Sequence, residues 1–127
     1  MKLRVVGAFF QIAFFSHFLH FTSFYSDDVI RVAEYVLHYA DGRTAVLPVD
    51  YGKDIRDWWN VFGEPAETAD AVVVWTGSTP MAGRLGHRIR LWMRTYENPR
   101  PEVEITSIDL ISEMAQPSPC IIALTVE

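Results

Sequence analysis

The stretch YVLHYADGRTAVLPV, residues 35–49, contains the strongest structural signal in this sequence. Two runs rich in β-branched and aromatic residues flank Ala40-Asp41-Gly42-Arg43. An Asp-Gly pair between two extended runs is among the strongest hairpin signals that a sequence offers. Pro48 lacks a backbone N–H, so we expect it at an unpaired position or at a bulge. The segment therefore predicts two antiparallel strands joined by a tight turn.

Apolar runs on either side of this hairpin predict further strands. Residues 3–24 contain two such runs, Val5–Phe15 and Phe18–Phe24, and their β-branched and aromatic content favours strands with a break near Ser16. Residues 71–75 form a short continuous apolar run, which is consistent with a strand buried on both faces. The turn-forming residues 76–80 end that run.

The segment Arg88–Tyr96 alternates with period two. Ile89, Leu91 and Met93 share one face, and the other face carries Arg88, Arg90, Trp92, Arg94 and Tyr96. This pattern predicts a half-exposed strand that buries the aliphatic face and turns the arginines and aromatics to solvent.

Two more strands are predicted towards the C-terminus, at 103–112 and 121–126, with prolines between the runs. In residues 103–112 the apolar positions fall on both faces, so we expect burial on both sides or a bulge that shifts the face. Residues 50–70 lack strand periodicity, and residues 54–59 are expected to make one helical turn. The pattern of seven or eight strands predicts an all-β fold, an antiparallel β-sandwich or jelly roll. The 127 residues suit one domain, residues 1–127.

Composition and charge exclude several classes of protein. The formal net charge of −5 disfavours nucleic-acid binding through a basic surface. The single cysteine, Cys120, permits neither an internal disulfide nor a cysteine-type zinc site, and we expect it to act as a small buried hydrophobe.

The N-terminus allows two interpretations. Lys2 and Arg4 followed by an apolar run resemble the start of a signal peptide or anchor. Gln11 and His17 interrupt the run, however, and no small-residue cleavage site follows. We therefore prefer a buried strand for residues 1–14, and expect membrane association only if this segment is an anchor.

Several motifs resemble an uncharacterised bacterial module of the galactose-binding-like β-sandwich type. They are HFLHFT at 17–22, HYADG at 38–42, LPVDYGKDIRDWW at 47–59, VWTG at 74–77 and TYENPRP at 95–101. The similarity covers residues 15–127, and the Asp-Trp-Trp block is its most specific part. It implies an accessory piece of a larger extracellular, periplasmic or cell-surface protein, related in shape to carbohydrate-binding modules, with no catalytic residues to carry over. Only residues 1–14 represent the strands that precede HFLHFT in that module, which implies a truncated copy or a deliberately short version.

The leading candidate ligand site is an aromatic block made of Tyr51, Trp58 and Trp59. Flat aromatic rings stack on the C–H faces of sugars, and the neighbouring Arg56 and Asp57 could orient them through hydrogen bonds. The alternative is that these residues anchor the loop and the core.

A second candidate site is the stripe formed by Arg90, Trp92 and Arg94, continued by Tyr96. Guanidinium groups interleaved with aromatic rings suit an acidic sugar. The alternative is a solvent face covered by long side chains.

Catalytic and metal sites have little support in the sequence. His17 and His20 fall on opposite faces of a strand, so joint metal coordination is not expected. Acidic pairs such as Asp54 and Asp57 could serve a hydrolase, but nothing selects one pair, and the common nucleotide-binding, hydrolase and metalloprotease motifs are absent. We expect no enzyme and no cofactor; a structural calcium is an open alternative without a recognisable ligand loop.

Two functions lead, and the tryptophans separate them; a hydrolase, which would need two carboxylates facing each other in a cleft, is the third alternative. A glycan-binding module predicts at least one exposed Trp beside a concave polar patch. A structural or protein-interaction domain predicts that all four Trp residues are packed, and that an apolar edge or face lies near the N-terminal Phe residues.

Overall fold

Where the structure describes the chain, almost all regular structure is β-strand, and the strand pairs are antiparallel. The computed structural model describes residues 2–15, 18–22, 27–59, 65–115 and 117–127. The strands are β1 (Lys2–Phe15), β2 (Phe18–Thr22), β3 (Arg31–Tyr39), β4 (Thr44–Asp50), β5 (Ala71–Gly77), β6 (Ile89–Glu97), β7 (Ile105–Ser112) and β8 (Pro117–Val126). A short helix, α1 (Pro80–Arg84), lies between β5 and β6. The prediction of an all-β antiparallel fold is confirmed.

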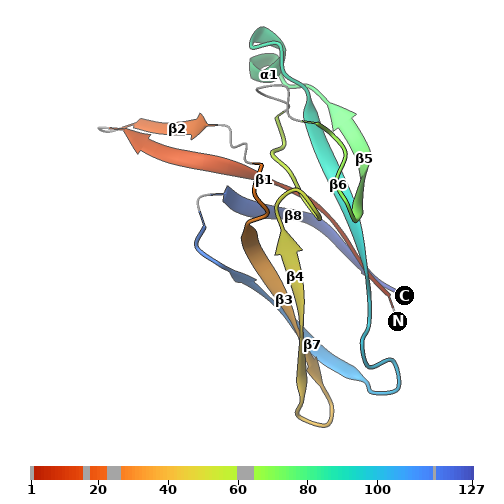
Figure 1. Ribbon diagram of the computed structural model, residues 1–127. Coiled ribbons are helices and arrows are strands. Elements are labelled where there is room, and N and C mark those ends of the chain that lie inside the picture. Colours follow the sequence, from red (N-terminus) through yellow and green to blue (C-terminus); the bar gives the residue numbers. More distant parts are fainter. Residues whose placement is uncertain (1, 16–17, 23–26, 60–64, 116) are drawn as a thin grey trace.

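The strands form two sheets (Figure 1). In the larger sheet the order is β2-β1-β6-β5, and β8 also pairs with β1. In the smaller sheet β3 lies between β4 and β7. The two chain ends lie side by side, because β1 and β8 pair as far as Leu3 and Val126, and Arg4 forms a 3.1 Å ion pair with Glu127.

The hairpin predicted from residues 35–49 is present as β3 and β4. Its last pair joins His38 to Thr44, and Gly42 in the turn has φ of 82°, the left-handed conformation that glycine adopts without a steric penalty. Pro48 lies in β4, an edge strand, so no strand on its outer side needs the N–H that it lacks.

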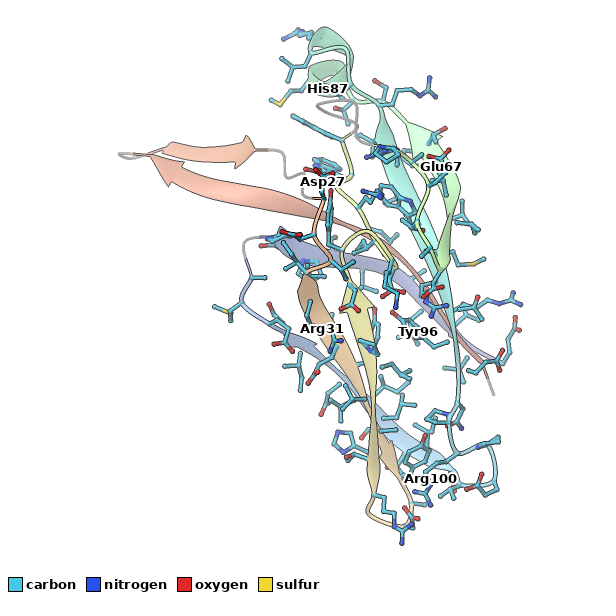
Figure 2. The ribbon with its side chains drawn as sticks, viewed as in Figure 1. Asp27, Arg31, Glu67, His87, Tyr96 and Arg100 are labelled. Atoms are coloured by element: carbon cyan, nitrogen blue, oxygen red, sulfur yellow. The ribbon has the colours of Figure 1, made fainter. Side chains whose placement is uncertain are left out.

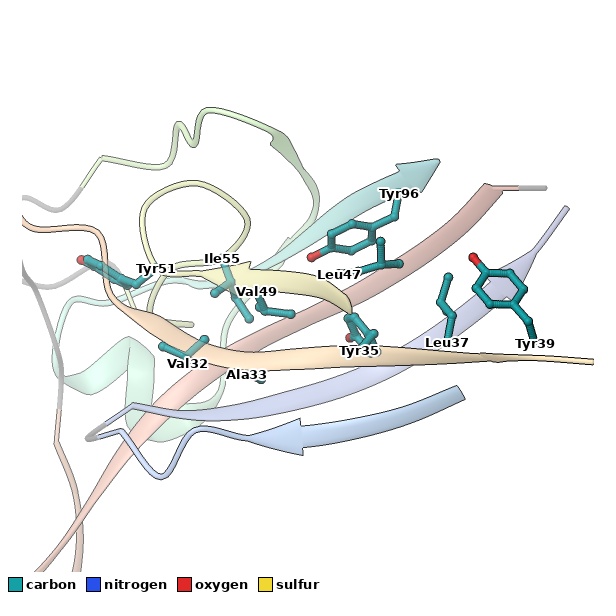
Figure 3. Packing of buried hydrophobic residues seen from close by; sticks show 10 residues of the cluster. All are labelled: Val32, Ala33, Tyr35, Leu37, Tyr39, Leu47, Val49, Tyr51, Ile55 and Tyr96. Atoms are coloured by element: carbon teal, nitrogen blue, oxygen red, sulfur yellow. The ribbon is translucent and has the colours of Figure 1, made fainter. Parts of the chain in front are cut away.

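Side chains from both sheets make up the main apolar cluster (Figure 3). Alternate residues of β3 point inwards, among them Tyr35, Leu37 and Tyr39. From the other sheet Tyr96 brings its ring to 5.8 Å from that of Tyr35 at 67°, an edge-to-face contact that is typically worth about 1 kcal/mol beyond the area it buries. The Tyr96 hydroxyl also donates a 2.9 Å hydrogen bond to the carbonyl of Pro48, so the two sheets are joined by polar and apolar contacts.

The strand at 88–96 is present as β6, but the prediction of its buried face is only partly right: Ile89 is buried and Arg88 is exposed as predicted, and the rest of the strand differs. Arg90 and Trp92 are only 4% and 1% exposed, and Tyr96 is buried as well, whereas Leu91 and Met93 are half-buried. Period two identifies two faces but not which one meets the core. Here the arginine and aromatic face turns inwards, because backbone carbonyls are available there to bind the guanidinium groups.

The strand at 71–75 is present within β5, but its predicted burial on both faces is wrong. It is the last strand of its sheet, and Trp75 is 50% exposed. A continuous apolar run does not distinguish a central strand from an apolar edge strand.

For β7 the sequence predicted either a bulge or burial on both faces. The structure has the bulge, and the strand is not buried on both faces. The register with β3 skips Thr106, so that Ile105 and Ile108 both pack against the main cluster while most of the strand is exposed.

The connecting segments differ from prediction in two places. Residues 54–59 form turns and isolated bridges instead of a helical turn. Helix α1 was not predicted; it begins after Thr79, whose Oγ1 accepts a 3.1 Å hydrogen bond from the N–H of Ala82.

The two N-terminal runs do form strands, β1 and β2, as far as they are described, and the predicted break near Ser16 lies outside the described residues. His17 lies outside the described residues. In the part of the chain that the structure describes, no helix has the length and apolar character that a membrane crossing requires.

Candidate functional site

Arg90 brings the two predicted candidate sites together. From β6 its Nη2 donates to the carbonyl oxygens of Asp57 at 2.9 Å and Trp59 at 3.3 Å, and its Nη1 donates to that of Pro65 at 3.1 Å. Its own N–H donates to the Trp58 carbonyl at 2.8 Å. The aromatic block is therefore bound directly to the arginine stripe.

Trp92 binds the backbone at Ala66, close to the Pro65 carbonyl that Arg90 binds. Its indole Nε1 donates a 2.9 Å hydrogen bond to the carbonyl of Ala66, and the guanidinium carbon of Arg90 lies 4.8 Å from its ring centroid. Such cation–π contacts gain strength when the cation is shielded from water, as Arg90 is here.

Three rings stack beside this loop. Trp58 and Trp59 lie 5.6 Å apart at 16°, and His87 lies on the ring of Trp59 at 5.5 Å and 28°. Asp57, fully buried, accepts a 3.1 Å hydrogen bond from the N–H of Trp59. Trp59 is buried, and within the described chain its indole N–H has no hydrogen-bond partner. Trp58 is half-buried and is the member of the pair that keeps some contact with solvent.

Arg94 and Asp54 form a second polar cluster, together with Asp70. Arg94 Nε donates to Asp54 Oδ1 at 2.7 Å, and Arg94 Nη2 lies 3.5 Å from the Asp70 carboxylate. The other Asp54 oxygen accepts a 2.8 Å bond from the N–H of Asp50. Burial raises the pKa of Asp54 in spite of these donors, which favour the charged form.

A cavity of about 20 Å³ adjoins this cluster. Asp54 and Arg94 line it together with apolar side chains that include Tyr35, Trp92 and Tyr96. That volume suits about one water molecule and is far below the several hundred Å³ of a small-molecule pocket.

Tyr51 and Arg56 complete the predicted set. Tyr51 is fully buried, and the guanidinium carbon of Arg56 lies 5.5 Å from its ring centroid. Arg56 Nε donates a 2.8 Å hydrogen bond to the carbonyl of Glu67.

The structure therefore gathers all eight predicted site residues into one region, but mostly inside it. Trp58, Arg56 and Arg94 retain partial exposure; Tyr51, Asp57, Trp59, Arg90 and Trp92 are buried. These contacts hold the backbone at Asp57, Trp59, Pro65 and Ala66 in place.

The two predicted carboxylates of this region are both engaged with the protein itself. Asp54 is occupied by Arg94, and Asp57 is buried against the loop backbone. Among the described residues, no three His, Cys, Asp or Glu side chains lie close enough together to hold a metal ion.

Sequence reasoning passed over Trp75. It is exposed on β5, and its ring lies close against Gly77: a Cβ placed at Gly77 would be 2.1 Å from Cη2 of Trp75. The sequence does contain a signal for this contact: Gly77 follows Trp75 by two residues, so the two lie on the same face of the strand and the glycine leaves room for the ring.

Two grooves also lie outside the predicted set. One, of about 230 Å³, is lined by Ile105, Thr106, Ser107, Ile108 and Val126. The other, of about 410 Å³, is lined by Ala66, Glu67, Thr68, Ala71, Val72 and Val73. Each runs beside an outermost strand, β7 in the first case and β5 in the second.

Comparison of the chain with protein-family models, with curated proteins and with solved structures gives no match.

Proposed function

We propose that this chain is a non-catalytic accessory module that binds another polypeptide, and that its two sheets form a β-sandwich of the jelly-roll, galactose-binding-like type. The contact of Tyr96 with Tyr35, and of Ile121 with the same cluster, supports the face-to-face arrangement of the sheets.

The observation that carries the protein-binding proposal lies on the side formed by β7 and β8. Residues directly opposite each other in an antiparallel pair share a face of the sheet. Leu110 lies opposite Tyr35, and Val126 and Tyr96 both lie opposite Leu3, so Leu110 and Val126 point to the core side. They are nevertheless 44% and 48% exposed.

A polypeptide is the partner that this side fits. Its groove is lined by aliphatic and hydroxyl side chains, and the sequence of β7, ITSIDLIS, contains neither proline nor lysine, the residues that commonly protect edge strands. Its one charged residue, Asp109, is bound to His38 at 2.8 Å. Exposed apolar surface of this kind is typical of protein interaction sites.

The test compares lysine substitutions on the two faces of the smaller sheet and on β8. Leu110→Lys and Val126→Lys change core-side positions, and Val46→Lys, at a residue that is 51% exposed, is the matched control because Val46 lies opposite the outward-facing Val36. We expect the wild type to bind an apolar dye such as anilinonaphthalene sulfonate and to self-associate reversibly in a sedimentation series. The first two variants should weaken both effects and the control should not.

A wild type that neither binds the dye nor self-associates would overturn the proposal. Equal effects of all three substitutions would overturn it as well, because the core side would then have no special part. Circular dichroism of each variant establishes that it is folded.

The exposed ring of Trp75 contradicts the prediction that all four Trp residues are packed in a protein-interaction domain. Together with the half-buried ring of Trp58, it favours a glycan as the second candidate partner. A glycan array probed with the wild type, Trp75→Ala and Trp58→Ala tests it. Binding that disappears in a folded variant supports the glycan, and silence across the array favours the polypeptide.

A further inference from the structure

We propose that the groove beside β5 binds an extended, positively charged segment of a partner polypeptide, which adds to the larger sheet as a further strand. This inference rests on the proposed function in that it assumes a polypeptide partner. It concerns a different edge of the molecule, however, so the two can fail separately.

The groove is open, and its size suits a peptide. Its volume of about 410 Å³ lies within the range of protein ligand sites. One wall is the loop at Ala66, Glu67 and Thr68, and the other is the first half of β5. Figure 2 places Glu67 beside β5.

The loop wall is held in position before any partner arrives. The carbonyl of Ala66 accepts the indole hydrogen bond of Trp92, and the carbonyl of Glu67 accepts that of Arg56. A wall fixed in this way costs little ordering entropy when a ligand binds.

The backbone of β5 offers hydrogen bonds towards the groove. Thr68 Oγ1 donates to the carbonyl of Ala71 at 2.6 Å and accepts from its N–H at 3.1 Å, so both groups of Ala71 point away from β6. In an antiparallel strand the N–H and C=O of alternate residues point to the same side. The N–H and C=O of Val73 therefore point to the same outer edge, where an added strand would pair with them.

The charge of the groove selects the segment. Its six lining residues include one carboxylate, the exposed Glu67, and no basic group. Exposed Val72 and Trp75 on the same strand add apolar and aromatic surface, and an indole ring attracts cations. A segment that alternates valine with lysine or arginine matches these features.

The test measures the binding of short synthetic peptides to the whole chain by fluorescence anisotropy. The probe is a labelled peptide that alternates valine with lysine, and its control replaces each lysine with glutamate. Two further probes carry backbone N-methyl groups on the odd or on the even residues. Because only alternate residues of an added strand face β5, one methylated peptide should lose binding and the other should keep it.

Two changes in the protein complete the experiment. Glu67→Gln should weaken binding of the lysine peptide about two- to fivefold, the range of a single exposed ion pair, and added salt should do the same. Leu110→Lys, on the β7 side, should leave this affinity unchanged.

The proposal is overturned if the lysine peptide does not bind, if the glutamate peptide binds equally well, or if both methylated peptides keep full affinity. If Leu110→Lys abolishes binding in a folded protein, the peptide occupies the β7 side. That result would agree with the proposed function and would overturn the proposal that the peptide binds beside β5.

Discussion

The guanidinium group of Arg100 holds the Asp41 carboxylate through two hydrogen bonds, 3.1 Å from Nη1 to Oδ1 and 2.6 Å from Nη2 to Oδ2. Arg100 also lies over the ring of Tyr39, with 4.8 Å between its central carbon and the ring centroid. The segment between β6 and β7 is thereby fastened to the turn of the β3–β4 hairpin.

This pair makes stability depend on pH in the acid range. Hydrogen bonds from Arg100 and from the N–H of Arg43 lower the pKa of Asp41 from 3.8 to about 2. A lowered carboxyl pKa stabilises the folded state above the unfolded value and loses that effect as pH falls through the folded value. We expect the free energy of unfolding to fall between pH 4 and pH 2, and Asp41→Asn to remove part of that fall.

Urea unfolding at a series of pH values measures the effect. Glu104→Gln, which changes an exposed carboxylate next to the same turn, is the control and should leave the acid limb in place. An Asp41→Asn profile parallel to the wild type would contradict the prediction.

Substitution of Arg90 is expected to be costly even by another cation. Lysine retains the charge but not the fork that reaches the carbonyls of Asp57, Trp59 and Pro65. We expect Arg90→Lys to lower the free energy of unfolding by about 2 to 3 kcal/mol, the range for lost hydrogen bonds to a buried charged group. The near-ultraviolet circular dichroism of the stacked tryptophans should weaken too. The exposed neighbour provides the control: Arg88→Lys should change stability by less than about 0.5 kcal/mol.

A methyl group at Gly77 should move the ring of Trp75. Because the new Cβ would lie 2.1 Å from the ring, the side chain must rotate away. We expect Gly77→Ala to shift Trp75 fluorescence with a stability change below about 1 kcal/mol, since the ring is exposed. A Trp75→Phe background should abolish the shift, and a shift that persists there would show that another tryptophan had responded.

The turn at Gly42 should tolerate asparagine better than alanine. Apart from Gly42 and its two chain neighbours, no described residue comes within 4 Å of a Cβ built at Gly42, so the penalty arises from φ of 82°. We expect Gly42→Ala to cost about 1 kcal/mol and Gly42→Asn less, because asparagine adopts the left-handed region more readily. Equal losses measured by thermal unfolding would point to a different cause.

Local signals in the sequence predicted where the strands lie, but not which segments pack against each strand. The Asp41-Gly42 pair locates the hairpin because turn chemistry acts over four residues. The burial of β5 and the inward face of β6 depend on which segments pack beside them, and neither period nor composition contains that information. The largest error concerns Arg90, which was predicted to face solvent and is buried. A buried guanidinium is stable only where a distant loop supplies its carbonyl partners.

The same limit applies to the candidate site. Aromatic and arginine residues were selected one segment at a time, and their mutual contacts, such as Arg90 with the carbonyl of Trp59, are visible only in three dimensions. Their chemistry suits both ligand contact and loop anchoring. The glycan interpretation of these eight residues stays a prediction that the array experiment can decide.

The three carbonyl bonds of Arg90 also affect any attempt to re-engineer this protein. The loop backbone at Asp57, Trp59 and Pro65 is held by a side chain some 30 positions later in the chain. A transplant of that loop into another scaffold would have to include the arginine on the neighbouring strand, or the transplanted backbone would lack the cation that holds it in shape. Randomised libraries should likewise vary the loop and leave Arg90 constant.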